Sequence, residues 1–235
     1  MGYGYYGYYF DPTYLLVLIG AVLCIYAQMR VQSTYHKYAR VPSRTGMTGA
    51  QAAQRILNLS GIYDVRIEHI RGELTDHYDP SNKVLRLSDT VYGSSSIAAI
   101  GVAAHECGHA VQHQKEYSPL KIRSALVPAA NIGSRAGIPL IILGAVLGMN
   151  QVLIQIGIWV FSLAVLFQLV TLPVEFNASG RALAMLGNYG MMERDEVSSC
   201  RKVLKAAALT YVAAAASAIL QLLRLVLLFG RRSDD

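Results

Sequence analysis

Charged residues are scarce in this chain of 235 residues: they make up 15% of it, while 53% of the residues are apolar. Disordered chains combine low hydrophobicity with high charge, so this composition excludes that class. Cysteine is scarce too, and the three present (Cys24, Cys107 and Cys200) lie far apart and form no C-x-x-C pair. This spacing argues against a disulfide framework and against a thiolate zinc site.

The sequence also has no compact basic patch, although its formal net charge is +6. The basic residues are spread along the chain without a nucleic-acid-binding motif, so we expect no nucleic-acid partner. What the chain does contain is long uncharged apolar runs, which are typical of an integral membrane protein.

The first run, residues 12–29, would form a helix about 27 Å long, which is enough to cross a bilayer core. It follows a leader, residues 1–11, that is rich in Gly and Tyr and contains no Lys or Arg. A cleaved signal peptide carries positive charge before its apolar core. We therefore expect residues 12–29 to form a retained transmembrane helix behind an aromatic interfacial leader, with partner binding as the alternative role of that leader.

Two further runs follow. Residues 136–174 are uncharged and would form about 58 Å of helix, nearly twice the bilayer core, with a plausible turn at residues 148–151. This predicts a transmembrane helical hairpin whose two ends lie on the same membrane face. The last run, residues 206–230, contains Arg224, so it is expected either to cross fully or to be buried against the other helices.

The basic residues predict how the chain is oriented. Of the 21 Lys and Arg residues, 13 lie between Arg30 and Arg135 and five between Arg181 and Lys205. Under the positive-inside rule, these segments face the cytoplasm and the leader and hairpin tip face outward. Arg231 and Arg232 would oppose this assignment if the last helix crosses fully. The predicted location is therefore a cell membrane, with several spans and with the basic segments on the cytoplasmic side.

Residues 30–135 are expected to form a small cytoplasmic domain. The pattern predicts a helix between Thr48 and Gly61, strands at residues 65–70 and 83–87, and a turn at residues 78–83. A longer helix is predicted to start near Ile97, after a capping run of serines, and to continue past His113.

That helix contains the motif H-E-x-x-H, as His105-Glu106-Cys107-Gly108-His109. Residues four apart lie on one helix face about 6 Å apart, so the two imidazoles are spaced to bind one zinc ion. Glu106 lies about 100° around the helix, where it can exchange a proton with a water that the metal activates. The alternative is a helix whose histidines are satisfied by internal hydrogen bonds.

A catalytic zinc site needs a third protein ligand. His113 is about 12 Å along the axis from His105, too far to share one ion. Glu175 is the candidate, because it lies at the end of the uncharged hairpin. The hairpin crosses the membrane twice, so it brings Glu175 back to the membrane face on which the helix with His109 lies. Its alternatives are interfacial solvation or pairing with Arg181. Three other acidic residues are rivals for the third ligand position, but they are more simply explained as part of a solvated loop or helix start: Glu193, Asp195 and Glu196.

At these motifs the chain resembles the YugP-like family of predicted bacterial membrane zinc metallopeptidases, and its layout is similar to the HtpX-type membrane gluzincins. The segments that carry the resemblance are residues 76–80, 85–88, 96–112, 173–179 and 207–212. The resemblance implies one Zn²⁺ per chain bound by His105, His109 and Glu175, with Glu106 as the general base. HtpX-like proteins usually have Asp where this chain has Ser179, so Ser179 or Asn177 would orient a histidine more weakly.

The resemblance also implies that the strand at residues 83–87 presents an open edge to an extended peptide. Tyr211 and Arg181 are both candidates for stabilising an oxyanion. Three polar residues nearby, Asp76, His77 and Asp79, could contact substrate, although turn formation is the simpler explanation for them.

The sequence therefore predicts a mainly α-helical integral membrane protein of three to four transmembrane helices with a small α+β gluzincin-type zinc metalloprotease domain. Residues 175–205 would form the segment that carries the glutamate ligand. The predicted function is zinc-dependent endopeptidase activity on membrane or unfolded proteins. The alternative is a non-catalytic zinc-bound membrane adaptor or chaperone. Expected partners are a protein or peptide substrate and the lipid bilayer, with membrane proteins or a second copy as further candidates.

Overall fold

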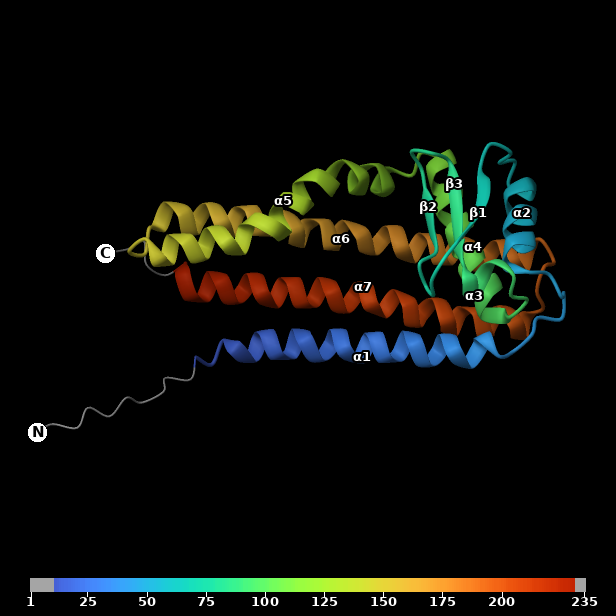
Figure 1. The fold of residues 1–235 in the computed structure, drawn as a ribbon, viewed down its shortest axis with the longest axis horizontal. Coiled ribbons are helices and arrows are strands. Elements are labelled where there is room, and N and C mark those ends of the chain that lie inside the picture. The colour runs from blue at the N-terminus through green and yellow to red at the C-terminus, as the bar shows by residue number, and fades with distance from the viewer. Residues whose placement is uncertain (1–10, 231–235) are drawn as a thin grey trace, which may run out of the picture.

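Four long helices run alongside one another in the structure, a computed structural model that describes residues 11–230 (Figure 1). They are α1 (Tyr14–Ala39), α5 (Ser118–Val146), α6 (Gln151–Asn188) and α7 (Arg194–Phe229). Each is long and apolar enough to cross a membrane. The chain is thus a mainly helical membrane protein. The predicted aromatic leader and Arg231 lie outside the described residues, apart from Asp11.

A small α+β part lies at one end of these helices (Figure 1). It comprises α2 (Gly49–Leu59), β1 (Arg66–Ile70), β2 (His77–Asp79), β3 (Val84–Ser88), α3 (Asp89–Tyr92) and α4 (Ile97–Gln114). The expected helix after Thr48 is confirmed as α2, and Thr48 forms a capping box with Gln51. The two expected strands are confirmed as β1 and β3.

The sheet order is β1-β3-β2, with β1 parallel and β2 antiparallel to β3. The prediction that residues 83–87 present an open edge was wrong, because β3 pairs on both sides. The interpretation of the chain before Lys83 as turn alone missed β2. This strand has three residues, too few for an alternating pattern to identify it.

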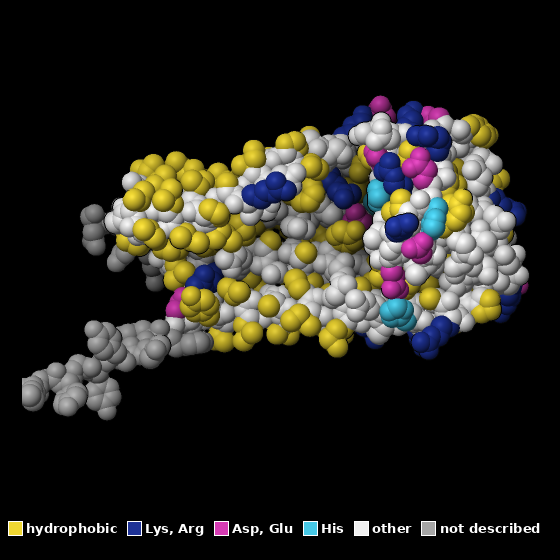
Figure 2. All heavy atoms as spheres, in the orientation of Figure 1, with side chains coloured by type: hydrophobic (Ala, Val, Ile, Leu, Met, Phe, Trp, Pro, Cys, Tyr) yellow, Lys and Arg dark blue, Asp and Glu magenta, His cyan; other side chains and the backbone are white. Residues whose placement is uncertain are grey.

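Side-chain polarity divides the molecule along its length. Figure 2 shows hydrophobic side chains over the end that contains only long helices, and Lys, Arg, Asp, Glu and His gathered around the sheet. On α1, large apolar side chains such as Leu18, Val22 and Ile25 are more than half exposed. Such a surface is stable against lipid rather than water.

Helices α5 and α6 form the expected hairpin, and the turn lies where the sequence placed it. Gly148 and Met149 have positive φ, and the Asn150 side chain caps α6 by accepting a hydrogen bond from Leu153 N. The helices also pack very closely, since a Cβ at Gly137 would lie 2.8 Å from Phe161 Cβ. Both helices extend beyond residues 136–174, because α5 begins at Ser118 and α6 ends at Asn188.

Arg224 does not end α7. Its guanidinium lies 3.5 Å from a carboxylate oxygen of Asp11 and over the ring of Tyr14, at 4.3 Å from the centroid. These contacts come from the beginning of α1, beside the end of α7 (Figure 1). A charge that is paired and stacked in this way can be accommodated close to a membrane interface.

Helix α4 is the centre of the α+β part. The Ser96 hydroxyl caps it by accepting from Ala99 N, as the serine run predicted. Its residues are mostly small and buried, which lets α2, α6 and α7 pack around it. The closest approach is at Gly108, where an added Cβ would lie only 2.5 Å from Ala178 O of α6. A glycine at this position therefore brings α6 against the H-E-x-x-H helix.

Candidate metal centre

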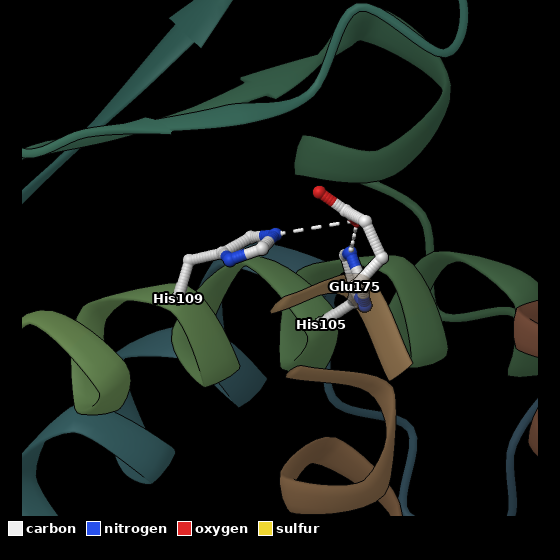
Figure 3. Close-up of side chains that lie close together, drawn as sticks. All are labelled: His105, His109 and Glu175. Carbon is white, nitrogen blue, oxygen red and sulfur yellow. Dashed lines mark ion pairs between the residues drawn. The ribbon is translucent and has the colours of Figure 1, made fainter. Parts of the chain in front are cut away.

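Three potential metal ligands converge where α4 meets α6 (Figure 3). His105 Nε2 lies 3.3 Å from Glu175 Oε2, and His109 Nε2 lies 3.6 Å from the same oxygen. One ligand atom from each of the three residues lies within 4.8 Å of the others. The hairpin has returned Glu175 to the histidine pair, as expected from the sequence.

The polar atoms of this cluster fit a metal ion. Glu175 Oε2 is buried and has no hydrogen-bond partner in the structure, which is costly for a carboxylate oxygen. Two imidazole nitrogens and one carboxylate oxygen match the ligand set of a catalytic zinc site that leaves a fourth position open. The orphaned oxygen and its two neighbouring nitrogens would be satisfied together by one bound cation.

The electrostatics of the cluster favour positive charge. Burial alone would lower the pKa of His109, but Glu175, together with the charge of Glu106 and the contact with Gln112, outweighs burial, so the pKa is raised above its ordinary value. Glu175 thus attracts a cation to the space between the rings, whether that cation is a proton or a metal.

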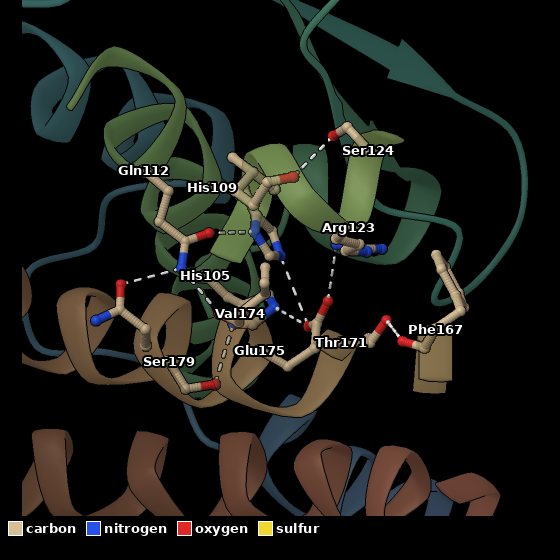
Figure 4. A network of polar contacts seen from close by, with 12 residues as sticks. His105, His109, Gln112, Arg123, Ser124, Phe167, Thr171, Val174, Glu175 and Ser179 are labelled. Carbon is tan, nitrogen blue, oxygen red and sulfur yellow. Dashed lines mark hydrogen bonds and ion pairs between the residues drawn. The ribbon is translucent and has the colours of Figure 1, made fainter. Parts of the chain in front are cut away.

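Ser179 supports the first histidine from the outside. Its hydroxyl oxygen lies 3.1 Å from His105 Nδ1 (Figure 4). This contact leaves Nε2 directed at Glu175, so Ser179 orients the ring as the sequence suggested it could. The other candidate, Asn177, forms no hydrogen bond with either ring, and its Oδ1 accepts from Gln112 and Arg181 instead.

Gln112 supports the second histidine and was missed from the sequence. Its Oε1 lies 3.0 Å from His109 Nδ1, while its Nε2 donates to Val174 O at 2.8 Å and to Asn177 Oδ1 at 3.0 Å (Figure 4). Because a backbone carbonyl can only accept, the amide nitrogen must face α6 and the amide oxygen must face the ring. His109 therefore carries its proton on Nδ1 and keeps the Nε2 lone pair for the centre.

Arg123 of α5 holds the outer oxygen of the carboxylate. Its guanidinium Nη1 donates to Glu175 Oε1 at 3.2 Å (Figure 4). The two oxygens are thus divided, with Oε1 facing Arg123 and Oε2 facing the histidines. Nothing in the local sequence around Arg123 distinguishes it from the other basic residues, so it was not predicted.

Two cavities meet at the centre, with volumes of about 270 and 260 Å³. Residues of α1 and α7 contribute to the lining of the first, and residues of β2 and the first part of α5 contribute to the lining of the second. Five residues line both cavities: Asp76, His105, Glu106, Glu175 and Tyr211. Glu106 is buried but reaches both cavities, beside the histidines, as its place in the motif predicts.

The acidic residues around β2 differ in role. Asp76 accepts from Ser88 N and Oγ, and burial raises its pKa despite these donors. Asp79 accepts from the turn residue Asn82 and from Arg86, which lower its pKa to about 2. Turn formation therefore explains Asp79, whereas Asp76 faces the cavities.

His77 and His113 take no part in the metal cluster. His77 lines only the second cavity, where its Nδ1 lies 2.9 Å from Thr75 O. His113 Nδ1 lies 2.9 Å from the Tyr78 hydroxyl, which ties β2 to α4. Burial raises the pKa of Tyr78 to about 12, so its hydroxyl remains protonated at neutral pH.

The remaining candidates lie elsewhere. Arg181 donates to Asn177 Oδ1 at 2.7 Å and stacks on Tyr117, and it lines neither cavity of the centre. The rival acids are engaged with Arg44: Glu193 and Asp195 form ion pairs with it, and Glu196 accepts from its backbone and caps α7. They form a helix start, as expected.

Comparison with known proteins gives a direct family assignment. The family model described as "Putative neutral zinc metallopeptidase" matches residues 13–230. The chain belongs to this family. It is also 48% identical to the "Putative membrane protease YugP" of Bacillus subtilis (strain 168). The alignment spans 223 residues and covers 94% of this chain and 99% of the relative. No solved structure matches the chain. The family description implies zinc, in agreement with the ligand cluster.

Proposed function

We propose that this protein is a membrane-embedded zinc endopeptidase of the gluzincin type, which hydrolyses peptide bonds of membrane or unfolded proteins. One Zn²⁺ per chain would be held by His105, His109 and Glu175. The convergence of these side chains on a buried, unsatisfied carboxylate oxygen carries the proposal. The family description and the relative's name support it.

A bound zinc ion would supply Lewis acidity for the scissile carbonyl and make water a stronger acid. The chain supplies proton transfer. Glu106 lines both cavities next to the two histidines, where its carboxylate can accept a proton from the attacking water and deliver it to the leaving amine. Ser179 and Gln112 keep the Nε2 atoms of the two rings directed at the centre.

Tyr211 is the candidate that would stabilise the developing negative charge on the carbonyl oxygen. It lines both cavities together with Glu106, whereas Arg181, the other candidate, lines neither. A hydroxyl directed at the developing oxyanion donates a hydrogen bond that strengthens in the transition state.

The centre is proposed to face the cytoplasm of a bacterial cell. The basic segments, residues 30–135 and 181–205, lie largely at or near the end that carries the sheet, whereas the hairpin tip and the start of α1 lie at the opposite end (Figure 1). Under the positive-inside rule the sheet end is cytoplasmic. A substrate could then approach from the cytoplasm beneath β2.

The test is Glu106→Gln in purified full-length protein. The variant keeps the size of the side chain but cannot accept a proton, so we expect stoichiometric zinc and peptide hydrolysis reduced by at least about 100-fold. Glu116→Gln is the control, because Glu116 is exposed and contacts Lys121 rather than the centre. Equal hydrolysis by Glu106→Gln and the unmodified chain would refute the mechanism and favour a non-catalytic zinc-bound adaptor or chaperone.

A further inference from the structure

A separate groove of about 420 Å³ lies between α6 and α7. Its floor and walls are mainly apolar, with Phe176 and Leu183 contributed by α6 and Leu209 and Val212 by α7. No acidic side chain lines it. Gly180 faces the groove with open space, since an added Cβ would meet no atom within 4 Å.

Two cations lie along one side of this groove. Arg201 and Lys205 are one helical turn apart on α7, and both are exposed. Neither forms an ion pair with any residue in the part of the chain between positions 11 and 230. The groove therefore combines a positive end with an uncharged apolar end.

The depth of the groove matches the cytoplasmic boundary of a bilayer. Lys205 lies 24 residues before Phe229, the end of α7, which is about 36 Å of helix and longer than a hydrocarbon core of about 30 Å. Val212 lies about 10 Å deeper than Lys205. The cations thus lie at the level of lipid headgroups, and the apolar end of the groove extends toward the acyl chains.

We propose that this groove binds an anionic phospholipid of the surrounding leaflet. The headgroup phosphate would lie between Arg201 and Lys205, and an acyl chain would follow the groove past Phe176 and Val212. Charge complementarity and depth select this occupant over a zwitterionic lipid, because basic pockets between transmembrane helices recognise anionic headgroups. The proposal needs only the membrane position of the chain and is independent of peptidase activity.

The bound lipid would lie against the wall of the metal centre. Ser179, Leu204 and Ala208 line both this groove and the larger of the two cavities at the centre. The Ser179 hydroxyl is also the outer partner of His105. One face of this wall would therefore contact lipid while the other holds a histidine in position.

The headgroup is tested by native mass spectrometry of the full-length protein, titrated with phosphatidylglycerol and with phosphatidylcholine of the same acyl chains. We expect phosphatidylglycerol to bind about tenfold more tightly. The double variant Arg201→Gln/Lys205→Gln should lose that preference. The matched control is Arg194→Gln/Lys202→Gln, which removes the same charge from α7 outside the groove and should keep it.

The acyl-chain part is tested by Gly180→Leu, which fills the open space without removing a charge and improves helix propensity. We expect this variant to bind phosphatidylglycerol more weakly than the unmodified protein does. We also expect that glycerol phosphate, which has the headgroup chemistry without the acyl chains, does not compete with phosphatidylglycerol for the unmodified protein. Three results would each overturn the proposal: equal affinity for the two lipids, the same loss in the control double variant, or unchanged binding by Gly180→Leu.

Discussion

At the scale of single residues, the centre is defined as much by the side chains behind the ligands as by the ligands. The sequence predicted His105, His109 and Glu106 from spacing, and Glu175 from the geometry of a hairpin. It could not predict the role of Arg123, because the hydrogen bond from Arg123 to Glu175 joins two helices and no local sequence pattern indicates it. Gln112 is different, since it lies three residues after His109 on the same helix and that spacing could have suggested it.

Arg123 gives the first prediction. Replacing it with Met removes the partner of Glu175 Oε1 and frees the carboxylate to rotate away from the histidines. Loss of an outer partner typically weakens metal affinity by about 10- to 100-fold, and we expect this range for Arg123→Met, measured by zinc competition with a chelator. Lys121→Met is the control on the same helix, because Lys121 pairs with the exposed Glu116. Equal affinities in the two variants would contradict the prediction.

Tyr211 gives the second prediction. Tyr211→Phe removes one hydroxyl from the shared wall of the two cavities, so kcat should fall by about 100-fold while zinc content stays unchanged. Steady-state hydrolysis of a fluorogenic peptide measures this effect. The exposed Tyr63→Phe serves as the control. A change in KM alone would assign Tyr211 to substrate binding instead.

At the scale of elements, close packing places the ligands. The sequence predicted α4 and the α5–α6 hairpin, including its turn, from apolar runs and capping residues. How α4 and α6 cross depends on Gly108 meeting the backbone at Ala178, which no periodicity reveals. The sheet shows the same limit: two strands were predicted, but their neighbours depend on long-range pairing, so β3 was wrongly expected at an edge.

Gly108→Ala tests this packing. The new Cβ would lie 2.5 Å from Ala178 O, so α6 must move and carry Glu175 away from the histidine pair. We expect zinc affinity at least about tenfold lower, along with a lower melting temperature. Gly101→Ala on the same helix is the control, because its Cβ would meet the Cys200 side chain at 3.3 Å, which leaves α6 in place. Equal zinc affinities in the two variants would show that the approach of α6 does not control the centre.

At the scale of the whole molecule, the arrangement of charge along the helices predicts the orientation in the membrane. The hairpin tip and the Asp11–Arg224 pair lie at one end of the helices, and the sheet and centre lie at the other (Figure 1). Pairing with Asp11 offsets the charge of Arg224, so the strongest uncompensated basic density is at the sheet end. If all four helices cross, the start of α1 and the end of α7 lie at the end opposite the centre, and Arg231 and Arg232 are the basic residues that oppose this orientation.

Cysteine labelling in bacterial cells tests that orientation. Ser81→Cys places a thiol in the turn before β3, and Gln151→Cys places one at the start of α6, in a Cys24→Ala background that leaves only the buried Cys107 and Cys200. A membrane-impermeant maleimide should label Gln151→Cys in intact cells and Ser81→Cys only in inverted vesicles, because the positive-inside rule assigns the sheet end to the cytoplasm. The reverse pattern would place the metal centre outside the cell. Substrates would then have to be sought among exported proteins rather than cytoplasmic ones.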